Sequence, residues 1–428
     1  MTNPRSPRRV AILGGTRIPF VKSFTAYPTD SNQEMLIHVL TKLVQQFGLQ
    51  GKKVGDVAFG SVMAHSGDWN LSREVVLGSG LAPETPAFNV QRACGTSLDT
   101  TNLIALKIAS GQIDVGIAGG SDTNSDLPVV YRRDLAQRLV AAGRARSLAE
   151  KVRAFSGLSL ADLKPRLPAV VEPRTKMSMG QHCEVMAKEW KITREAQDQL
   201  AYESHQKAAK AYERGFYSDL VTEYRGLTRD AILRPDTTVE KLAKLKPAFD
   251  TSSAGTLTAG NSTALTDGAS AVLLASEDYA KQNGFPILAY LVDVQTAAVD
   301  YVSGKEGLLM APAVAVSEIL KRNNLSLQDF DLYEIHEAFA AQVLCTLKAW
   351  ESEDYCKTVL GRDKAMGSID RNKLNVNGGS LAVGHPFAAT GSRIVASLAK
   401  ALRERGGGRG LISICTAGGM GVVAIVEA

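Results

Sequence analysis

The sequence predicts an α/β fold, first because strand-like and helix-like segments alternate along its N-terminal third. Residues 10–13 form an apolar run that ends in a glycine-rich turn, and residues 35–47 have the apolar spacing of a helix. Residues 54–60 are a second strand candidate. Strands that alternate with helices in this way are typical of α/β proteins.

A repeated pattern is the second observation behind this prediction. The apolar segment 98–111 is expected to be a helix buried on all sides, and it is followed by strand 113–118 and a pair of glycines. Near the C-terminus a helix over 387–405 is followed by glycines, by strand 410–415 and by another glycine pair. The recurrence predicts two homologous halves, each an α/β layer, around a shared core.

The alternation of strands and helices stops in the middle of the chain. Residues 132–166 contain nine basic and three acidic residues, a local charge of +6. Helices are expected at 184–191 and at 194–215, the latter capped by Thr193. We therefore predict an inserted, mainly helical lobe over residues 123–255.

Composition narrows the class of protein. With 428 residues, 45% of them hydrophobic and 22% charged, the chain predicts a globular protein of two or three domains. A net charge of +5 gives little support to nucleic-acid binding. The five cysteines have neither disulfide-type nor metal-ligand spacing, so no metal site is expected. Residues 1–9 lack a signal-peptide core and no segment has the length of a membrane span, which predicts a cytoplasmic protein.

Cys94 is the first candidate for chemistry. It stands in Asn89-Val-Gln-Arg-Ala-Cys-Gly-Thr-Ser97, immediately before the predicted helix. Free N–H groups and the positive end of the helix dipole favour a thiolate there, as a nucleophile requires. A small buried hydrophobic residue is the alternative interpretation, and this stretch alone leaves both open.

Three further reactive residues lie on glycine-rich turns or at the ends of predicted strands. His385 follows a glycine-rich stretch and precedes Pro386, so its backbone is restricted. Cys415 ends an apolar strand, and His336 follows another strand-like run. Carboxyl ends of strands in α/β folds are common ligand sites. Two cysteines and two histidines suit acyl transfer, in which a thiolate attacks an acyl carbon and the other groups move protons.

These residues stand in motifs that resemble those of the thiolase family. The matching motifs are Arg-Ala-Cys94-Gly-Thr-Ser, His336-Glu-Ala-Phe-Ala, Gly-His385-Pro and Cys415-Thr-Ala-Gly-Gly-Met-Gly, in this order, and the similarity extends along nearly the whole chain. The resemblance implies two duplicated α/β domains in five layers (α-β-α-β-α), with an inserted, mainly helical loop domain. The implied N-terminal half is 1–122 with 256–282, the loop domain is 123–255, and the C-terminal half is 283–428.

The resemblance also implies roles for individual residues. Cys94 would become acylated, His385 would activate it, and Cys415 would act as acid and base. His336, where most thiolases have Asn, would help His385 to hold a water in an oxyanion hole. Backbone N–H groups of Cys94 and Ala417 would form a second oxyanion hole, although many relatives have Gly at position 417. Coenzyme A, as a substrate and not a tightly bound cofactor, would lie along Ala259, Gly260, Ser262 and Thr263.

A histidine at position 336 is characteristic of thiolase subunits of fatty-acid β-oxidation complexes. The implied reaction is cleavage of 3-ketoacyl-CoA by coenzyme A, giving acetyl-CoA and a shortened acyl-CoA, by an oligomeric acyltransferase. An acetoacetyl-CoA thiolase is opposed by His336 and by the basic insertion, and a ketoacyl synthase by the second cysteine. A non-catalytic thioester- or lipid-binding relative would not be expected to keep all four reactive positions.

The basic segment 132–166 leaves three interpretations open. Its apolar residues recur at intervals of three and four, which predicts amphipathic helices with basic flanks. Such helices can pack on their own domain, contact anionic lipid, or bind a hydratase and dehydrogenase subunit, as the resemblance implies. The excess of Arg over Lys, which suits pairing with carboxylates, favours the protein partner over the lipid.

Overall fold

The fold is built on one mixed ten-stranded sheet. The structure, a computed structural model, describes residues 7–428. Strands follow the order β4-β3-β5-β6-β1-β7-β10-β9-β8, and β2 pairs with β6. The strands are β1 (Val10–Arg17), β2 (Val21–Lys22), β3 (Asp56–Phe59), β4 (Ala87–Asn89), β5 (Val115–Asp122), β6 (Thr266–Ser276), β7 (Ala289–Ala298), β8 (Leu332–Ile335), β9 (Arg409–Thr416) and β10 (Met420–Glu427).

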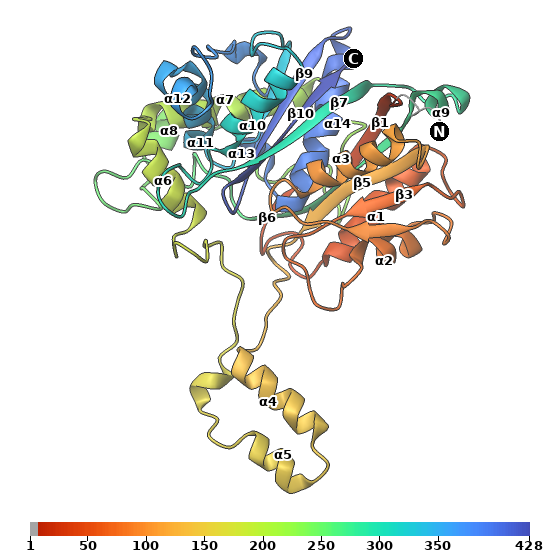
Figure 1. The fold of residues 1–428 in the computed structure, drawn as a ribbon, viewed down its shortest axis with the longest axis vertical. Helices are drawn as coiled ribbons and strands as arrows, with labels where there is room; N and C mark the ends of the chain where they lie inside the picture. The colour runs from red at the N-terminus through yellow and green to blue at the C-terminus, as the bar shows by residue number, and fades with distance from the viewer. Residues whose placement is uncertain (1–6) are drawn as a thin grey trace.

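Helices form three layers around the two halves of this sheet (Figure 1). The α-helices are α1 (Asn32–Gln46), α2 (Leu71–Gly78), α3 (Thr96–Ala109), α4 (Arg133–Arg144), α5 (Leu148–Ala154), α6 (Met179–Glu189), α7 (Arg194–Glu213), α8 (Val239–Ala243), α9 (Glu277–Gln282), α10 (Ala311–Arg322), α11 (Ala340–Glu351), α12 (Glu353–Thr358), α13 (Ser380–Val383) and α14 (Thr390–Glu404). Short 3-10 helices are η1 (Leu160–Leu163), η2 (Arg371–Lys373) and η3 (Phe387–Ala389).

The hydrophobic core follows the five predicted layers. One buried cluster joins α1 and α2 to the outer face of the N-terminal strands, and another joins α10 and α11 to the C-terminal strands. A third contains residues of α3 and α14 together with strands of both halves. The central helical layer is therefore shared by the two halves, as the sequence predicts.

The two halves have matching strand patterns. In the first, β3 is parallel to β5, which is antiparallel to β6, and β6 is antiparallel to β1. In the second, β8 is parallel to β9, which is antiparallel to β10, and β10 is antiparallel to β7. A short antiparallel contact, from Val10↔Leu291 to Ile12↔Ala289, joins β1 to β7. This correspondence supports the duplication predicted from the repeated glycine pairs.

Close packing of α3 against α14 brings the two halves together at the site. A Cβ atom on Gly391 would lie 2.3 Å from the backbone nitrogen of Leu98, so only glycine fits at this contact. The Ser392 N–H donates to Ser97 Oγ at 2.9 Å. The expectation that the first of these helices is buried on all sides is wrong at Leu106, which is 56% exposed.

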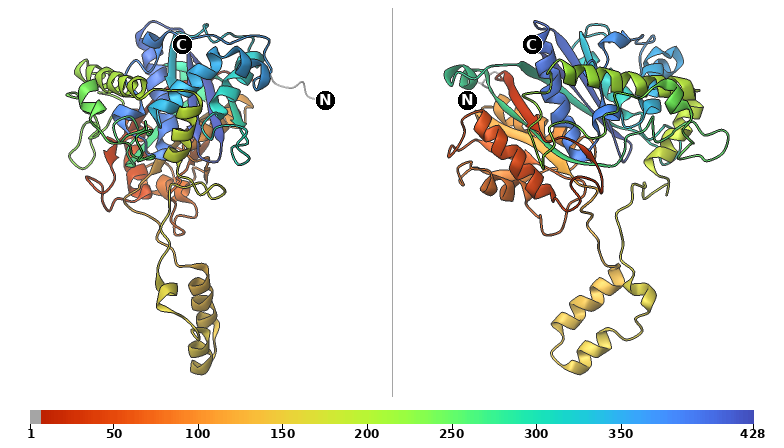
Figure 2. Two further views of the ribbon diagram at one scale, coloured as in Figure 1. Left: turned by 90° about the vertical axis from the view of Figure 1, so that its left-hand side faces the viewer. Right: turned by 180° about the vertical axis from the view of Figure 1, so that it is seen from behind.

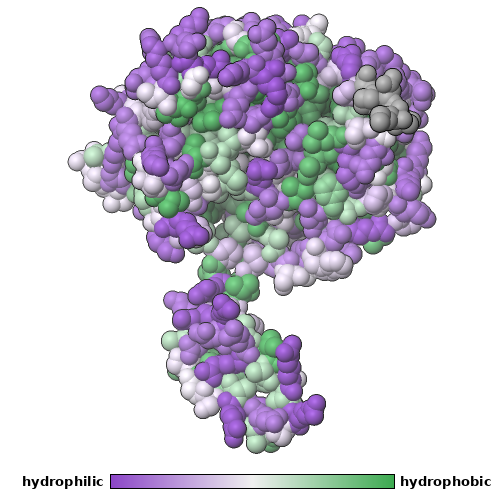
Figure 3. Space-filling view, in the orientation of Figure 1, coloured by the Kyte–Doolittle hydropathy of each residue, from purple (hydrophilic) through white to green (hydrophobic). Residues whose placement is uncertain are grey.

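The inserted segment contains a helical hairpin that projects away from the rest of the molecule (Figures 1 and 2). Helix α4 packs on α5 and on η1, and Leu135 is the buried residue of α4. Figure 3 shows hydrophobic surface at the neck and on the hairpin, where Val130, Leu139 and Val152 are exposed. Helices α4 and α5 therefore pack on each other within the hairpin, while several of their apolar residues stay exposed.

Among residues 7–428, no helix is both long and apolar enough to cross a membrane. The expectation that the chain begins without a signal peptide concerns residues 1–9, and the first six of these lie outside the described part of the chain.

Candidate active site

Three of the four predicted reactive residues line one cavity of about 230 Å³. Cys94, His385 and Cys415 lie in its wall. Cys94 precedes α3, His385 lies between α13 and η3, and Cys415 is the penultimate residue of β9. The rest of the wall is mainly apolar: Val170, Ser178, Met179, Gly180, Phe249, Thr263, Leu265, Leu309, Ala338, Phe339, Phe387 and Thr416.

A tight turn presents Cys94 to this cavity. Ala93 has a φ of +44°, a left-handed conformation that is uncommon for a residue other than glycine. Hydrogen bonds close the turn, with Gly95 N–H donating to Arg92 O at 2.9 Å and the Thr96 hydroxyl donating to Ala93 O at 2.7 Å. Strain held at a single residue by its surroundings is frequent at functional sites.

Burial controls the protonation of Cys94. It raises the pKa of the thiol to about 12, although the backbone N–H groups of Ala417 and of Cys94 itself act in the opposite direction. Burial therefore opposes the preference for a thiolate that the helix N-terminus gives to Cys94. The resting group is a thiol, so a base must remove its proton during attack.

His385 is placed to be that base. Its Nδ1 lies 2.6 Å from Thr390 Oγ1, and the Thr390 hydroxyl also lies 3.3 Å from the Pro386 carbonyl oxygen. The Nε2 atom is buried and has no hydrogen-bond partner within residues 7–428. Burial, and secondarily the Arg393 cation, lower the pKa of His385 to about 3, so its imidazole is neutral and can accept a proton.

His336 packs directly behind His385 and does not line the cavity itself. The centroids of the two rings are 4.0 Å apart, and His336 Nδ1 lies 2.8 Å from Ser380 Oγ. Its Nε2 is also buried without a partner among the described residues. Burial lowers the pKa of His336 well below 6.5, with His385 and Arg393 adding to the effect.

Cys415 precedes the turn that joins β9 to β10. Burial raises the pKa of its thiol well above the usual value, and the nearby Cys94 adds to the shift. In the turn, Gly418 and Gly419 have φ values of +77° and +70°, whereas Ala417 does not have a positive φ. An alanine at 417 therefore costs no backbone strain, and its N–H acts on Cys94.

A carboxylate from the inserted segment holds this turn. Glu172 Oε1 accepts the Gly418 N–H at 2.8 Å, and Oε2 accepts the Tyr301 hydroxyl at 2.8 Å. Glu172 is buried and lies in the loop between η1 and α6. No local pattern in the sequence singles out this residue, because its partners are distant along the chain.

Asp122 is a second buried carboxylate that the sequence-based search missed. Its Oδ1 accepts the N–H groups of Val62 and Met63, and its Oδ2 accepts that of Ala388 at 2.7 Å, next to the His385 segment. Burial raises the pKa of Asp122 to about 7. A charged residue at the end of an apolar strand, after a glycine pair, was the available signal.

The positions expected to contact coenzyme A are only partly brought to the cavity. Thr263 lines it, and its N–H donates to Ala338 O at 3.0 Å. Ala259 is exposed and Gly260 half-buried, whereas Ser262 is buried beside Phe339. Ala259, Gly260 and Ser262 lie outside the cavity wall.

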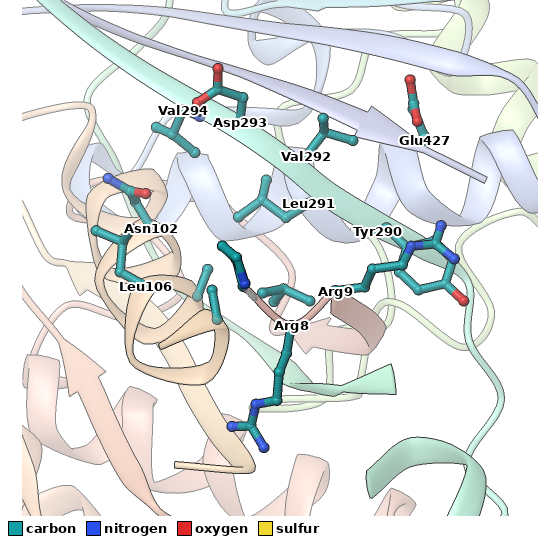
Figure 4. A pocket seen from close by; sticks show the side chains of 14 residues that line it. Arg8, Arg9, Asn102, Leu106, Tyr290, Leu291, Val292, Asp293, Val294 and Glu427 are labelled. Atoms are coloured by element: carbon teal, nitrogen blue, oxygen red, sulfur yellow. Dashed lines mark hydrogen bonds between the residues drawn. The ribbon is translucent and has the colours of Figure 1, made fainter. Parts of the chain in front are cut away.

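A larger cavity of about 360 Å³ lies between α3 and β7 (Figure 4). Its charged side chains are engaged in ion pairs, Arg8 with Asp114 at 2.5 Å and Asp293 with Arg322 at 2.8 Å. It contains no cysteine or histidine. The chemistry therefore points to the smaller cavity. Within residues 7–428, no group of three His, Cys, Asp or Glu side chains could hold a metal ion.

Comparisons with known proteins agree with the fold and the motifs. The thiolase N-terminal domain family matches residues 10–278 and the thiolase C-terminal domain family matches residues 285–428. The chain belongs to the thiolase family. It is 43% identical to a 3-ketoacyl-CoA thiolase of Yersinia pestis over 99% of this chain and 98% of that protein. This membership makes the chain an acyltransferase.

Two solved structures have the same fold. An acetyl-CoA acetyltransferase of Bacillus anthracis superposes with a TM-score of 0.82 and 30% identity, over 99% of each chain. A thiolase of Ascaris suum, solved in complex with coenzyme A, has a TM-score of 0.80 at 24% identity, over 98% of this chain and all of that one. These similarities confirm the predicted family and fold class.

Proposed function

We propose that this thiolase cleaves 3-ketoacyl-CoA with coenzyme A, giving acetyl-CoA and an acyl-CoA shortened by two carbons. The observation that carries the proposal is one cavity whose wall contains Cys94, His385 and Cys415. The full-length similarity to 3-ketoacyl-CoA thiolases supports this substrate class. We place the reaction in fatty-acid β-oxidation and the enzyme in the cytoplasm.

The first half-reaction begins at Cys94. Its sulfur attacks the C3 carbonyl carbon while His385 Nε2 takes the thiol proton, which is needed because burial keeps the resting group protonated. Cleavage of the C2–C3 bond leaves an acyl group on Cys94 and a carbanion of acetyl-CoA. Cys415 donates its proton to that carbanion, and acetyl-CoA departs.

The second half-reaction restores both cysteines. The Cys415 thiolate takes the proton of incoming coenzyme A, whose sulfur attacks the acyl carbon on Cys94. The bond to Cys94 breaks, and the departing thiolate regains the proton held by His385. Donors aimed at the two oxyanions lower the barriers, each by about 3 kcal/mol. We assign His336 and His385, with a water, to one oxyanion, and the N–H groups of Cys94 and Ala417 to the other.

An acetoacetyl-CoA thiolase is the second candidate, supported by the structural similarity to an acetyl-CoA acetyltransferase. The apolar wall built by Val170, Phe249, Leu309 and Phe387 favours a substrate with a longer acyl chain. Thiolysis of 3-ketoacyl-CoAs with four to sixteen carbons tests this choice. Activity confined to the four-carbon substrate would overturn the proposal in favour of the acetoacetyl enzyme.

We further propose that the chain is divided into an N-terminal half (1–122 and 256–282), a loop domain (123–255) and a C-terminal half (283–428). Support comes from β6, which returns after the loop segment to pair with β5 and β1. We also propose that coenzyme A passes Thr263 and extends toward Ala259, Gly260 and Ser262. The exposure of Ala259 agrees with a position toward the cavity mouth.

The projecting hairpin is our candidate for a protein interface. Its exposed apolar residues are flanked by arginines, and α4 and α5 bury little of their own surface. We propose that it docks a hydratase and dehydrogenase subunit, because an Arg-rich surface suits pairing with carboxylates. Contact with anionic lipid is the competing outcome. We also propose that the thiolase itself forms a homodimer or higher oligomer.

A further inference from the structure

A buried arginine lies behind the two histidines and has no place in the chemistry described above. Arg393 is on α14, its side chain is buried, and its Nη2 donates to Ser380 Oγ at 2.7 Å. Ser380 Oγ lies in turn 2.8 Å from His336 Nδ1. Arginine, serine and histidine thus form a chain of hydrogen bonds that ends at the site.

The chemistry of these groups sets the direction of each hydrogen bond. A guanidinium group can only donate, so Ser380 Oγ accepts from Arg393. His336 Nδ1 is the other partner of this hydroxyl among residues 7–428, and the buried hydroxyl can pair its own proton there only by donating it to Nδ1. A neutral imidazole that accepts at Nδ1 carries its proton on Nε2. The unpartnered Nε2 of His336 is therefore an N–H donor.

Thr390 gives His385 the opposite arrangement. The Thr390 hydroxyl donates to the Pro386 carbonyl, so its oxygen accepts Nδ1–H of His385. That leaves a lone pair on Nε2 of His385. One ring thus offers a donor and its neighbour an acceptor, although both have a buried and unpartnered Nε2.

We propose that Arg393 is a positioning residue that acts through Ser380 to hold His336 in the Nε2–H form, ready to donate to the water of the oxyanion hole. The inference rests on the proposed thiolysis for its role in catalysis, but the tautomer itself can be measured without activity. Arg393 touches neither the cavity nor the reacting atoms. Glu334 on β8 is buried and acts on Arg393 as its counter-charge.

The first test measures the tautomer. In protein labelled with nitrogen-15 at histidine, the His336 signals are assigned by their absence from His336→Asn. We expect an Nε2–H signature in the unaltered protein and in Ser380→Thr, which keeps the hydroxyl, and a loss of this signature in Ser380→Ala. An unchanged Nε2–H signature in folded Ser380→Ala would overturn the proposal, whatever its activity.

The second test separates positioning from a general structural role. Ser380→Ala should lower kcat by about tenfold or more in the unaltered background. The reason is that His336 then no longer holds its proton on Nε2, and the oxyanion hole loses a donor. In the His336→Asn background, where no imidazole tautomer needs to be held, it should change kcat by less than about twofold. Equal losses in both backgrounds would overturn the proposal. If Arg393→Lys folds, it should keep most of the Nε2–H signal, since a lysine ammonium can also donate to Ser380.

Discussion

The imidazole rings of His336 and His385 lie with their centroids 4.0 Å apart, and both rings have a buried Nε2 without a partner among residues 7–428. Neither ring is charged at neutral pH, because burial lowers both pKa values. Two neutral rings can lie this close without the repulsion that two cations would suffer. The pair can therefore divide proton acceptance and oxyanion binding between them.

Cys94 is expected to carry the acyl group. Incubation with 3-ketoacyl-CoA in the absence of free coenzyme A should leave one acyl group per chain, and peptide mass mapping should locate it on Cys94. Cys94→Ser should not be labelled under the same conditions, whereas Cys356→Ser, altered at a buried cysteine outside the cavity, should be labelled normally. An acyl group on Cys415 would reverse the roles of the two cysteines.

Cys415→Ala should block turnover more severely than it blocks alkylation of Cys94. The reason is that a proton-transfer group is lost while the nucleophile and its base remain. The unaltered enzyme should show ping-pong kinetics, and the variant should lose at least about a hundredfold in kcat, within the range for general acid-base catalysis. Equal loss of turnover and alkylation in a folded variant would contradict this division of duties.

His336→Asn should keep measurable activity, within about tenfold of the unaltered enzyme, because an amide can also donate to a water or an oxyanion. A histidine with an ordinary pKa would make the two proteins differ in pH dependence near neutrality. Burial lowers the pKa of His336 well below 6.5, so the two kcat profiles should instead run parallel near neutrality and separate only on the acidic side. Absence of activity at every pH in a folded variant would mean that the imidazole is essential.

Histidine burial should also make stability depend on pH. The pKa of His385 is about 3 in the folded chain and near 6.5 when unfolded, so between these values the unfolded state binds more protons. Stability therefore falls as pH decreases from 6.5 toward 3, by up to about 1.4 kcal/mol per pH unit from this group. Asp122 and Glu334, whose pKa values are raised to about 7, change the stability in the opposite direction. Both carboxyl groups are present in the unaltered protein and in a His385→Asn variant, so a comparison of the two isolates the contribution of His385.

Urea unfolding at pH 7.0, 6.0 and 5.0 measures this contribution. The free energy of unfolding of His385→Asn should fall less over this range than that of the unaltered protein. Leu106→Asn, altered at an exposed residue that does not titrate and lies outside the site, is the control and should keep the original slope. Identical slopes for the unaltered protein and His385→Asn would mean that His385 does not remain neutral in the folded chain.

Reversal of charge on the hairpin should separate binding from catalysis. Glu in place of Arg132, Arg133, Arg144 and Arg146 should leave thiolysis of short substrates intact and abolish co-purification with a hydratase and dehydrogenase subunit. Arg138 is left unchanged because it donates to Ala154 O at 3.0 Å and to Ser156 O at 2.6 Å within the hairpin, whereas Arg132 makes only a longer contact of 3.5 Å with Ala161 O. Four exposed lysines elsewhere, Lys52, Lys53, Lys321 and Lys364, provide the matched control.

Survival of the complex after the four arginine reversals would show that the hairpin is not its docking surface. Sedimentation with anionic liposomes would then decide whether the same charges bind lipid. If the lysine control also lost the complex, the loss would be a general effect of net charge. That result would also contradict a specific interface on the hairpin.

Much of the fold and the reactive residues could be predicted from the sequence because their signals are local. Hydrophobic periodicity located the main strands and helices, and Thr193 caps α7 as predicted. The motifs around Cys94, His336, His385 and Cys415 named the residues that lie at or beside one cavity. Reactive side chains and glycine-rich turns occur in short sequence motifs, so both could be recognised without the structure.

Only the tertiary structure decided what surrounds those residues. The pKa of Cys94 is raised by burial under segments that are distant along the chain. Glu172 and Asp122 act on backbone groups 246 and 266 residues away, and Arg393 reaches His336 only because α13 and α14 fold behind β8. Periodicity showed that the 132–166 segment could form amphipathic helices, but not that they would project from the body. Contacts between residues that are distant along the chain, and the desolvation that results from them, leave no pattern in a short stretch of sequence. They are therefore seen only in the tertiary structure.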